Sequence, residues 1–346
     1  MVGGGPWNGS IILDAPVWLS EQDLLQWRMD YDIFWVLTNL ITILDKDKNQ
    51  KVQFVPNGPQ CWALWNIVEM YATGRPSWGW FLKGRQFGFS TLFITILFIC
   101  ALRGQNGLLL AHLEKPGKSI FRKAEMSLAN LPTFEMTEED ADGERVQQVI
   151  SLVPPPTGFS KENIMTWAGK AHNATLRRDS AEIRDAGVGE TYQNAQFTEV
   201  PLFPDAPHTI GHLLPALSRV HGTFVNGEFT ARGEGDYAHS MWIQGLEADG
   251  IFRSVFAAWY WMKAYGRREW RPEDKPFTPM ELAVRDSVRK VGSEFPLGKN
   301  GALIPRLQEI YDRTGRVAVH DLEVGFELTD GHLLFLRDML KSFAGD

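Results

Sequence analysis

The segment RPSWGWFLKGRQFGFSTLFITILFICAL, residues 75–102, constrains the fold more than any other part of the sequence. It begins with an apolar run, continues through a basic loop that contains glycine, and ends in 11 consecutive apolar residues at 92–102. A membrane span needs about 20 apolar residues, so the final run predicts a helix buried in a protein core. The segment therefore predicts a strand, a loop and a helix, which is the context of a phosphate-binding loop.

The loop LKGRQFGFSTL has the spacing of a P-loop without its lysine. In GxxxxGK[ST] the lysine reaches the β- and γ-phosphates and the hydroxyl ligates Mg²⁺. Gly88 and Ser90 keep that spacing, but Phe89 occupies the lysine position. Backbone N–H groups at a helix N-terminus bind phosphate whatever the side chains are. We therefore predict a phosphate site in which Lys83 and Arg85 supply the missing charge, Arg85 through bidentate contacts.

Strand and helix patterns alternate around this loop. LLLAHL, NIMTWAG, AQFTEVPLF, GTFVNGEFTA and SVFAAWYW are typical of strands, and KPGKSIFRKAEMSLANL is typical of an amphipathic helix. Helices are also expected within residues 20–44 and at 279–291, 302–313 and 328–343, and KVQFVPN predicts a short strand. The acidic and proline-rich stretch 132–162 predicts an exposed excursion. This alternation predicts an α/β fold with a parallel sheet covered on both faces.

Composition narrows the functional classes. A chain of 346 residues can form one large domain or two ordinary ones, and its net charge of −7 requires any nucleic-acid contact to come from a local basic patch. Cys61 and Cys100 both lie in apolar surroundings, which favours free thiols and a reducing, cytoplasmic setting over disulfides or a metal cluster. The N-terminus MVGGGPWNGSII lacks the pattern of a signal peptide.

AQFTEVPLF places Glu199 where a buried strand is expected to end. A P-loop ATPase needs a carboxylate at such a position to orient the attacking water. A single glutamate at a strand end is more often a surface residue. Its order and distance behind the loop favour the catalytic interpretation.

These segments resemble the large terminase subunit of tailed bacteriophages, the ATPase that packages double-stranded DNA. LKGRQFGFSTL is similar to the modified Walker A motif of the family, KxRQxGxST, and GETYQNAQFTEV is similar to its Walker B region. NGPQ resembles the upstream glutamine motif, NGEFTARGEGDYAH the coupling motif, and LLLAHLEKPGKSIFRKAEMSLANLP the strand and helix after Walker A. VFAAWYWMKAY and FELTDGHLLFLRDML resemble the following strand and the helix that leads to the next domain. The resemblance extends over about residues 30–343.

The resemblance implies a RecA-like (ASCE) P-loop NTPase core with a central, mostly parallel sheet and a small C-terminal helical lid or linker subdomain. The corresponding division is 1–60 for an N-terminal helical segment with the adenine-contacting glutamine motif, 61–260 for the ATPase core and 261–346 for the lid or linker.

The resemblance also implies roles for individual residues. Glu199 and Arg85 would be catalytic, and Gln60 would contact the adenine edge. The nucleotide-binding set is Gln60, Lys83, Gly84, Arg85, Gln86, Phe87, Gly88, Phe89, Ser90 and Thr91. Mg²⁺ would be held by Ser90 and, through water, by Thr198. Glu228, Thr230 and Gly233 would couple hydrolysis to movement. The arginine-finger candidates are Arg177, Arg178 and Arg184, although three arginines on a charged stretch more often form a solvated face.

The implied cofactors are ATP and Mg²⁺. The implied partners are double-stranded DNA, the portal protein and the small terminase subunit, with a homo-oligomeric ring docked on the procapsid portal in the cytoplasm of the infected host cell and no membrane. The sequence ends where the RNase H-like nuclease domain of the family begins, so no nuclease activity is expected.

Phe89 and Thr198 depart from the usual motifs, and Gln196 stands where relatives often carry His. Two alternatives stay open: a helicase-like, DNA-stimulated ATPase and a catalytically inactive, terminase-like binding module.

Two further motifs have ordinary explanations. His208 and His212 have the i, i+4 spacing of a zinc site on a helix, but no glutamate follows the first histidine. GRREWRPEDK, residues 266–275, combines cations with Trp270 and could contact a DNA backbone. It is at least as typical of an exposed linker.

Overall fold

The structure is a computed structural model, and it describes residues 27–29, 32–45, 49–72, 74–139, 145–151, 153, 155–169, 173–247, 250–291 and 328–344. The helix expected at 302–313 and residues 20–26 of the first expected helix lie outside these ranges. The chain forms two compact units. The first consists of Met1–Val55, Leu64–Leu82 and Gly88–Val255, and the second of Pro56–Ala63, Lys83–Phe87 and Phe256–Asp346.

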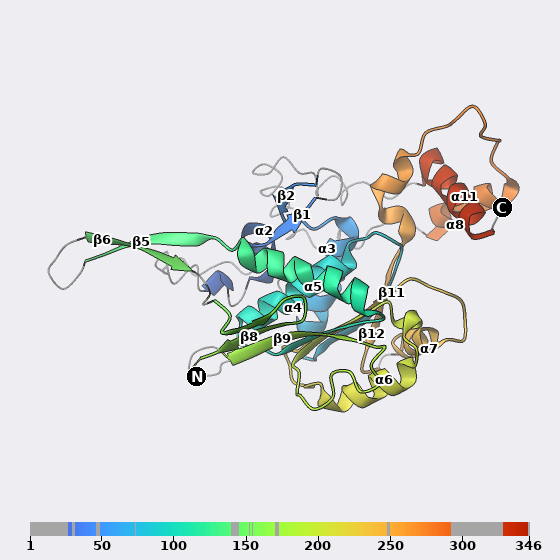
Figure 1. Ribbon diagram of the computed structural model, residues 1–346. Coiled ribbons are helices and arrows are strands. Elements are labelled where there is room, and N and C mark those ends of the chain that lie inside the picture. The colour runs from blue at the N-terminus through green and yellow to red at the C-terminus, as the bar shows by residue number, and fades with distance from the viewer. Residues whose placement is uncertain are drawn as a thin grey trace. The chain divides into compact units, whose positions relative to one another are not determined.

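An eight-stranded sheet with the order β12-β3-β11-β10-β4-β9-β8-β7 is the centre of the first unit (Figure 1). Its strands are β3 (Ser77–Lys83), β4 (Gly107–Ala111), β7 (Gly158–Ser160), β8 (Ile164–Ala168), β9 (Asn173–Ser180), β10 (Asn194–Thr198), β11 (Phe224–Phe229) and β12 (Arg253–Ala257). The pairs β3–β11, β11–β10, β10–β4 and β4–β9 are parallel, whereas β9–β8 and β8–β7 are antiparallel. The predicted α/β fold with a mostly parallel sheet is confirmed. The insertion of β11 between β3, which precedes the loop, and β10, which precedes Glu199, is the order of a RecA-like core.

The central strands are buried on both faces, which explains the nearly continuous apolar sequences of β3 (SWGWFLK) and β4 (GLLLA). Trp78 and Trp80 of β3, Leu108 and Leu110 of β4, and Phe197 of β10 belong to one core cluster of almost fully buried side chains.

Helices cover both faces of this sheet. Those of the central region are α3 (Gly58–Ala72), α4 (Phe89–Leu102), α5 (Glu114–Ala129), α6 (Ala206–Leu213) and α7 (Tyr237–Gln244). Figure 1 shows α4 and α5 on one side and α6 and α7 on the other. Nearly every residue of α4 is buried, as expected for a helix that is apolar all round. Among the described helices, none combines the length and apolarity that a membrane crossing requires.

The N-terminal part departs from the expectation of one helix over residues 20–44. Helix α2 (Ile33–Leu40) stops because Ile41 takes an extended conformation, and residues 42–44 are the strand β1 (Thr42–Leu44). This strand pairs in antiparallel fashion with β2 (Lys51–Gln53), the short strand expected from KVQFVPN. The β-branched Thr42 and Ile43 suit a strand better than a helix, and the apolar spacing alone did not distinguish the two.

The acidic stretch expected as an irregular excursion contains a β-hairpin. Strands β5 (Thr133–Glu139) and β6 (Arg145–Ser151) pair in antiparallel register as a separate two-stranded sheet. Both segments contain residues with a high strand propensity: Thr and Phe in TFEMTEE, and Val and Ile in RVQQVIS.

Sequence patterns also missed strand β9, because NATLRRDS contains three consecutive charged residues. The charge is tolerated because the arginines are paired. Arg178 donates from Nε to the backbone oxygen of Glu162 at 2.7 Å, and Arg177 lies 2.9 Å from Oε1 of Glu190. A polar-looking segment therefore occupies a place beside β4 in the sheet.

The second unit contains α8 (Pro279–Val291) and α11 (Asp330–Ala344), close to the predicted helices at 279–291 and 328–343. An ion pair joins them, since Arg337 Nε lies 2.7 Å from Glu281 Oε1. Aromatic stacking also stabilises this unit, because the ring centroids of Tyr265 and Phe335 lie 4.1 Å apart and the rings are nearly parallel.

Candidate functional site

The N-terminus of α4 has the backbone geometry of an anion-binding helix end. Gly88 precedes the helix with φ 74° and ψ 16°, a left-handed conformation that glycine adopts without strain. The backbone oxygen of Gly88 accepts hydrogen bonds from the N–H groups of Thr91 and Leu92, both at 3.0 Å. No side chain caps this end of the helix. The first turn, which carries Ser90, can therefore present N–H groups to an anion.

Phe89, which occupies the lysine position of the motif, is a core residue. Its side chain is 1% exposed, and its ring centroid lies 6.1 Å from that of Phe81 and 5.6 Å from that of Phe93. The substitution of lysine by phenylalanine thus adds to the aromatic core and supplies no charge to the loop.

Glu199 follows the last residue of β10 in a left-handed conformation, with φ 57° and ψ 50°. A residue other than glycine adopts this conformation at a cost of about 1–3 kcal/mol, and such residues cluster at functional sites. Its N–H donates to the backbone oxygen of Glu228 at 2.8 Å, which ties the end of β10 to β11. Because β3, β11, β10 and β4 are parallel, their carboxyl ends share one edge of the sheet, where α/β proteins bind ligands.

A buried carboxylate lies beside this edge. Glu228, on β11, is fully buried, and its Oε1 accepts hydrogen bonds from Gln196 Nε2 at 3.2 Å and from Thr198 Oγ1 at 3.0 Å. Gln196 Nε2 also lies 3.5 Å from the backbone oxygen of Ser90. We call Gln196, Thr198 and Glu228 the Glu228 network. It connects two strands of the sheet with the first turn of α4.

The Glu228 network gives Gln196 a role that sequence analysis did not assign. Gln196 and Thr198 alternate along β10 and so share a face, and Glu228 is the register partner of Thr198. Polar residues at alternate positions of a buried strand were the available signal. The hydroxyl of Thr198 donates to Glu228, and its expected contact with Mg²⁺ through water stays a prediction.

Two basic side chains near this edge were also missed. His112 directly follows β4; burial lowers the pKa of its imidazole, while the Glu199 carboxylate raises it and Arg232 lowers it further. The imidazole therefore favours its neutral form. Lys123, on α5, donates from Nζ to Thr91 Oγ1 at 2.6 Å.

The predicted coupling residues follow β11. Thr230 is half-buried just after the strand, and Gly233 is exposed with φ 132°, a backbone conformation that favours glycine. Glu228, the third member of that set, is in the Glu228 network.

The second unit contains the remaining predicted nucleotide-binding residues. Gln60 is buried at the start of α3 and exchanges two hydrogen bonds with Asn57, both at 2.9 Å. Asn57 Nδ2 donates to the backbone oxygen of Phe87 at 3.2 Å. The contact of Gln60 with adenine stays a prediction.

Residues 83–87 of the loop pack within the second unit. The Tyr265 hydroxyl donates to the backbone oxygen of Arg85, and the rings of Phe87 and Tyr265 lie 6.3 Å apart. Burial raises the pKa of Tyr265 to about 12, so its hydroxyl stays protonated as a donor. A Cβ at Gly84 would lie 2.9 Å from the Phe87 ring, which explains the glycine. Lys83 is buried, and Gln86 takes a left-handed φ of 60°.

The three arginine-finger candidates differ in exposure and pairing. Arg177 pairs with Asp179 at 3.3 Å as well as with Glu190, and the side chain of Arg178 is only 7% exposed. Arg184 is exposed in the turn after β9. Of the three, Arg184 has the side chain that a neighbouring molecule could reach most easily, and the finger role stays a prediction.

The histidine and GRREWRPEDK motifs show ordinary surroundings. His208 and His212 lie on α6 with ring centroids 4.2 Å apart, and no group of three or more His, Cys, Asp or Glu side chains suited to a metal ion occurs among the described residues. Arg268 pairs with Asp274 at 2.6 Å and with Asp338 at 2.9 Å.

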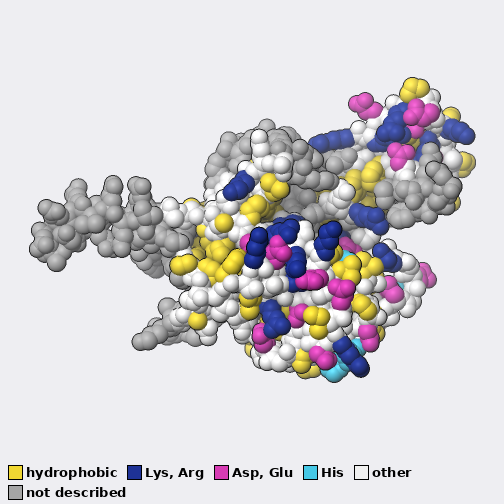
Figure 2. All heavy atoms as spheres, in the orientation of Figure 1, with side chains coloured by type: hydrophobic (Ala, Val, Ile, Leu, Met, Phe, Trp, Pro, Cys, Tyr) yellow, Lys and Arg dark blue, Asp and Glu magenta, His cyan; other side chains and the backbone are white. Residues whose placement is uncertain are grey.

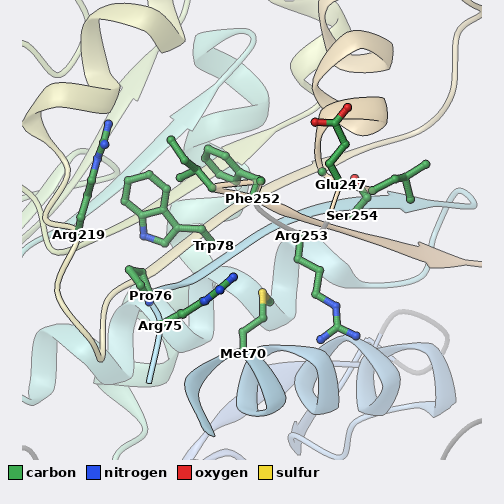
Figure 3. A pocket seen from close by; sticks show the side chains of 13 residues that line it. Met70, Arg75, Pro76, Trp78, Arg219, Glu247, Phe252, Arg253 and Ser254 are labelled. Atoms are coloured by element: carbon green, nitrogen blue, oxygen red, sulfur yellow. The ribbon is translucent and has the colours of Figure 1, made fainter. Parts of the chain in front are cut away.

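A separate pocket of about 760 Å³ lies at the other end of β3 (Figure 3). Its walls include Trp78 and Phe252 together with Arg75, Arg219 and Arg253. Because Arg75 and Trp78 flank the start of β3 whereas Gly88 follows its end, the pocket and the loop are separated by the length of the strand, about 20 Å. The pocket is therefore distinct from the candidate nucleotide site.

The sequence matches no protein-family model, and no curated protein is significantly similar to it. Among solved structures, the large terminase ATPase domain of Thermus phage P74-26 matches at 17% identity and a TM-score of 0.34, over 59% of this chain and 84% of that one. The large terminase of bacteriophage HK97 matches at 12% identity and a TM-score of 0.43, over 85% of this chain and 53% of that one.

A large terminase from a thermophilic bacteriophage, solved in complex with ADP, matches at 14% identity and a TM-score of 0.31, over 51% of this chain and 39% of that one. These identities and TM-scores are low, so the fold assignment depends on the strand order of the chain itself. The three solved structures named above are phage large terminases, the family to which the sequence motifs of this chain are also similar.

Proposed function

We propose that this chain is an ATP-hydrolysing motor that translocates double-stranded DNA, the ATPase part of a terminase large subunit. The observation that supports this function best is the convergence at one sheet edge. The glycine-preceded end of α4, the strained Glu199 and the buried Glu228 all lie where β3, β10 and β11 end. That arrangement combines an anion-binding helix end with a carboxylate suited to orienting water.

In this proposal Glu199 orients the attacking water for in-line displacement at the γ-phosphate. Phosphoryl transfer depends mainly on positioning and electrostatic stabilisation, so a fixed carboxylate is worth more than a mobile one. The hydrogen bond from its N–H to the Glu228 backbone and its left-handed conformation fix the backbone of Glu199 at the strand end, from which the carboxylate would orient the water.

The nucleotide would be held by residues of both sequence motifs. Gln60 would contact adenine, and Lys83 and Arg85 would contact the phosphates together with the loop backbone. Ser90 is the proposed ligand for Mg²⁺, with Thr198 acting through water; a hydroxyl in the first turn of an uncapped helix suits that cation. Bound Mg²⁺ would supply charge neutralisation of the phosphates.

Thr230, Gly233 and Glu228 would transmit the state of the γ-phosphate. Glu228 already links Thr198 and Gln196 to β11, so a shift of the first turn of α4 would reach β11 through two hydrogen bonds.

The proposed partners are double-stranded DNA, the portal protein and the small terminase subunit, in a homo-oligomeric ring on the procapsid portal in the host cytoplasm.

Figure 2 shows a mixed-charge surface over the region of α5, where Lys115, Lys118 and Arg122 lie on the same helix as Glu114. Because both signs of charge occur together on this surface, its net charge would not attract DNA strongly. DNA contacts would then come from local features, among which GRREWRPEDK has Arg271 and Trp270 exposed.

The experiment is steady-state phosphate release by the purified full chain with Mg²⁺, with and without linear double-stranded DNA. We expect ATP hydrolysis that double-stranded DNA stimulates, without separation of labelled strands. Strand separation coupled to hydrolysis would favour a helicase-like enzyme. ATP binding without turnover would indicate an inactive binding module, and the absence of both would contradict the proposal.

A further inference from the structure

The loop motif lacks the positive charge of its usual lysine. Phe89 stands where the P-loop lysine contacts the β- and γ-phosphates, and its ring lies in the core against Phe81 and Phe93. Backbone N–H groups carry only partial charges. Besides Lys83 and Arg85 of the loop, a cation from another element of the fold would therefore stabilise a triphosphate held by the first turn of α4.

Lys123 brings an ammonium group to this turn from α5. Its Nζ donates to Thr91 Oγ1 at 2.6 Å, and Thr91 directly follows Ser90 in the first turn of α4. The two residues are 32 positions apart in the sequence, and the packing of α5 on α4 brings them together. An ammonium has three N–H donors, so the contact with Thr91 is compatible with a second contact to an anion.

The electrostatic setting of Lys123 favours an anion nearby. Burial lowers the pKa of Lys123, whereas the carboxylate of Glu228 raises it. The N-terminus of α4 carries a partial positive charge of about 0.5, which repels an ammonium beside its first turn. Glu228 offsets part of this repulsion. Phosphate groups bound at the helix end would offset more, because they would interact favourably with both the helix dipole and the ammonium.

We propose that Lys123 supplies, from α5, the positive charge that the loop motif lacks at Phe89. The inference rests on the proposed ATPase function and adds Lys123 to Lys83 and Arg85. It also gives Thr91 a role, since its hydroxyl accepts a hydrogen bond from the ammonium in the helix turn that contains Ser90.

The test compares Lys123→Met with Lys118→Met in the full chain. Lys118 is on the same helix and pairs with the exposed Glu114 at 2.7 Å, so its loss controls for removal of a lysine from α5. Dissociation constants are measured for ATP, ADP and adenosine at fixed salt. A hydrogen bond to a charged group corresponds to about tenfold to hundredfold in affinity, so Lys123→Met should weaken ATP binding by that factor.

Ligands with different numbers of phosphates distinguish an electrostatic role of Lys123 from a role in packing. Lys123→Met should weaken ADP less than ATP and leave adenosine within twofold, and Lys123→Arg should restore most of the ATP affinity. Lys118→Met should bind all three ligands like the parent chain. A role confined to packing would instead lower the melting temperature without nucleotide and change all three affinities equally, which would overturn the inference.

The outcomes distinguish the two proposals. A parent chain that does not bind ATP contradicts the proposed function, and this inference with it. A parent chain that binds ATP, together with a folded Lys123→Met variant that binds it within twofold, overturns the role of Lys123 alone. If that variant does not fold, Lys123→Gln replaces it, because the carboxamide keeps a donor but loses the charge. Parental ATP affinity in Lys123→Gln would overturn the inference as well.

Discussion

Two buried carboxylates, Glu228 in the first unit and Glu281 in the second, are stabilised in different ways. Glu281 receives a guanidinium, with Arg337 Nε and Nη2 at 2.7 and 2.8 Å from its two oxygens, and a hydrogen bond from the backbone N–H of Thr278. These contacts lower the pKa of Glu281 to about 2. Glu228 receives neutral donors from Gln196 and Thr198, and its nearby cation, Lys123, is hydrogen-bonded to Thr91 of the loop-helix junction.

On the proposed function, this difference separates a structural charge, Glu281, from a functional one, Glu228. A bidentate guanidinium matches a carboxylate closely, so Glu281 and Arg337 hold α8 against α11 within the second unit. In the Glu228 network the donor Gln196 also lies 3.5 Å from the backbone oxygen of Ser90 in α4, so changes at the loop can reach the carboxylate. Substitutions at Glu281 should therefore change stability, and substitutions around the loop should change nucleotide binding and turnover.

The largest expected effect is at Glu199. Glu199→Gln keeps the shape of the side chain but removes the charge that orients water, so hydrolysis should fall by about 10²-fold or more, at least about 2.7 kcal/mol in the activation free energy. ATP affinity and melting temperature should stay near the parental values. Phosphate release at a near-parental rate would remove Glu199 from the catalytic role.

The complementary change is Glu281→Gln. It leaves Arg337 without its carboxylate partner, which should lower the free energy of unfolding by about 2 kcal/mol. This figure lies between the losses typical of exposed and of buried ion pairs. Denaturant unfolding of the full chain measures the loss, and ATP affinity should change less than twofold. A large loss of ATP affinity with unchanged stability would reverse the distinction drawn between the two carboxylates.

Low pH should remove the stabilisation that the Glu281–Arg337 ion pair provides. The pKa of Glu281 is lowered from 4.5 to about 2 in the folded chain, so its contribution is complete above pH 4.5 and is lost as the pH falls toward 2. Asp274, whose pKa Arg268 lowers to about 2, acts in the same direction. Melting temperature recorded from pH 6 to pH 2 should therefore fall less steeply in Glu281→Gln than in the parent. Parallel curves would contradict this assignment.

A smaller effect is expected at the two basic loop residues. Lys83→Ala and Arg85→Ala should each weaken ATP binding about tenfold, or about 1.4 kcal/mol, because each removes a positive charge from the predicted phosphate site. Arg122→Ala is the control, since Arg122 pairs with Glu162 on the surface. Parental ATP binding in both loop variants would locate the compensating charge elsewhere and leave Lys123 as its main source.

The smallest expected effect on function tests the link between the loop and Glu228. Gln196→Leu removes the donor shared by Glu228 and the backbone of Ser90, so turnover should fall a few-fold while ATP still binds. A loss of one hydrogen bond to a buried carboxylate also costs about 1–3 kcal/mol of stability. If turnover is unchanged in the folded variant, the Glu228 network is structural only.

The sequence predicted the parts of the site that are local. β3 and α4 follow from their apolar runs, and Gly88 and Ser90 follow from motif spacing. The Glu228 network depends on the register between β10 and β11, and the contact between Lys123 and Thr91 depends on how α5 packs against α4. Neither is encoded in a pattern over neighbouring residues, and β9 was missed because buried charge satisfied by tertiary partners resembles solvent-exposed charge in sequence.

Equilibrium binding of ATP to the Glu199→Gln variant of the full chain tests the central claim most directly, because binding can then be measured with little turnover. If the edge formed by β3, β10 and β11 is a nucleotide site, this variant should bind ATP with Mg²⁺ saturably, adenosine should bind more weakly, and the bound ATP should remain unhydrolysed while the parent chain releases phosphate. The absence of saturable binding at millimolar ATP, or equal affinity for ATP and adenosine, would contradict the account.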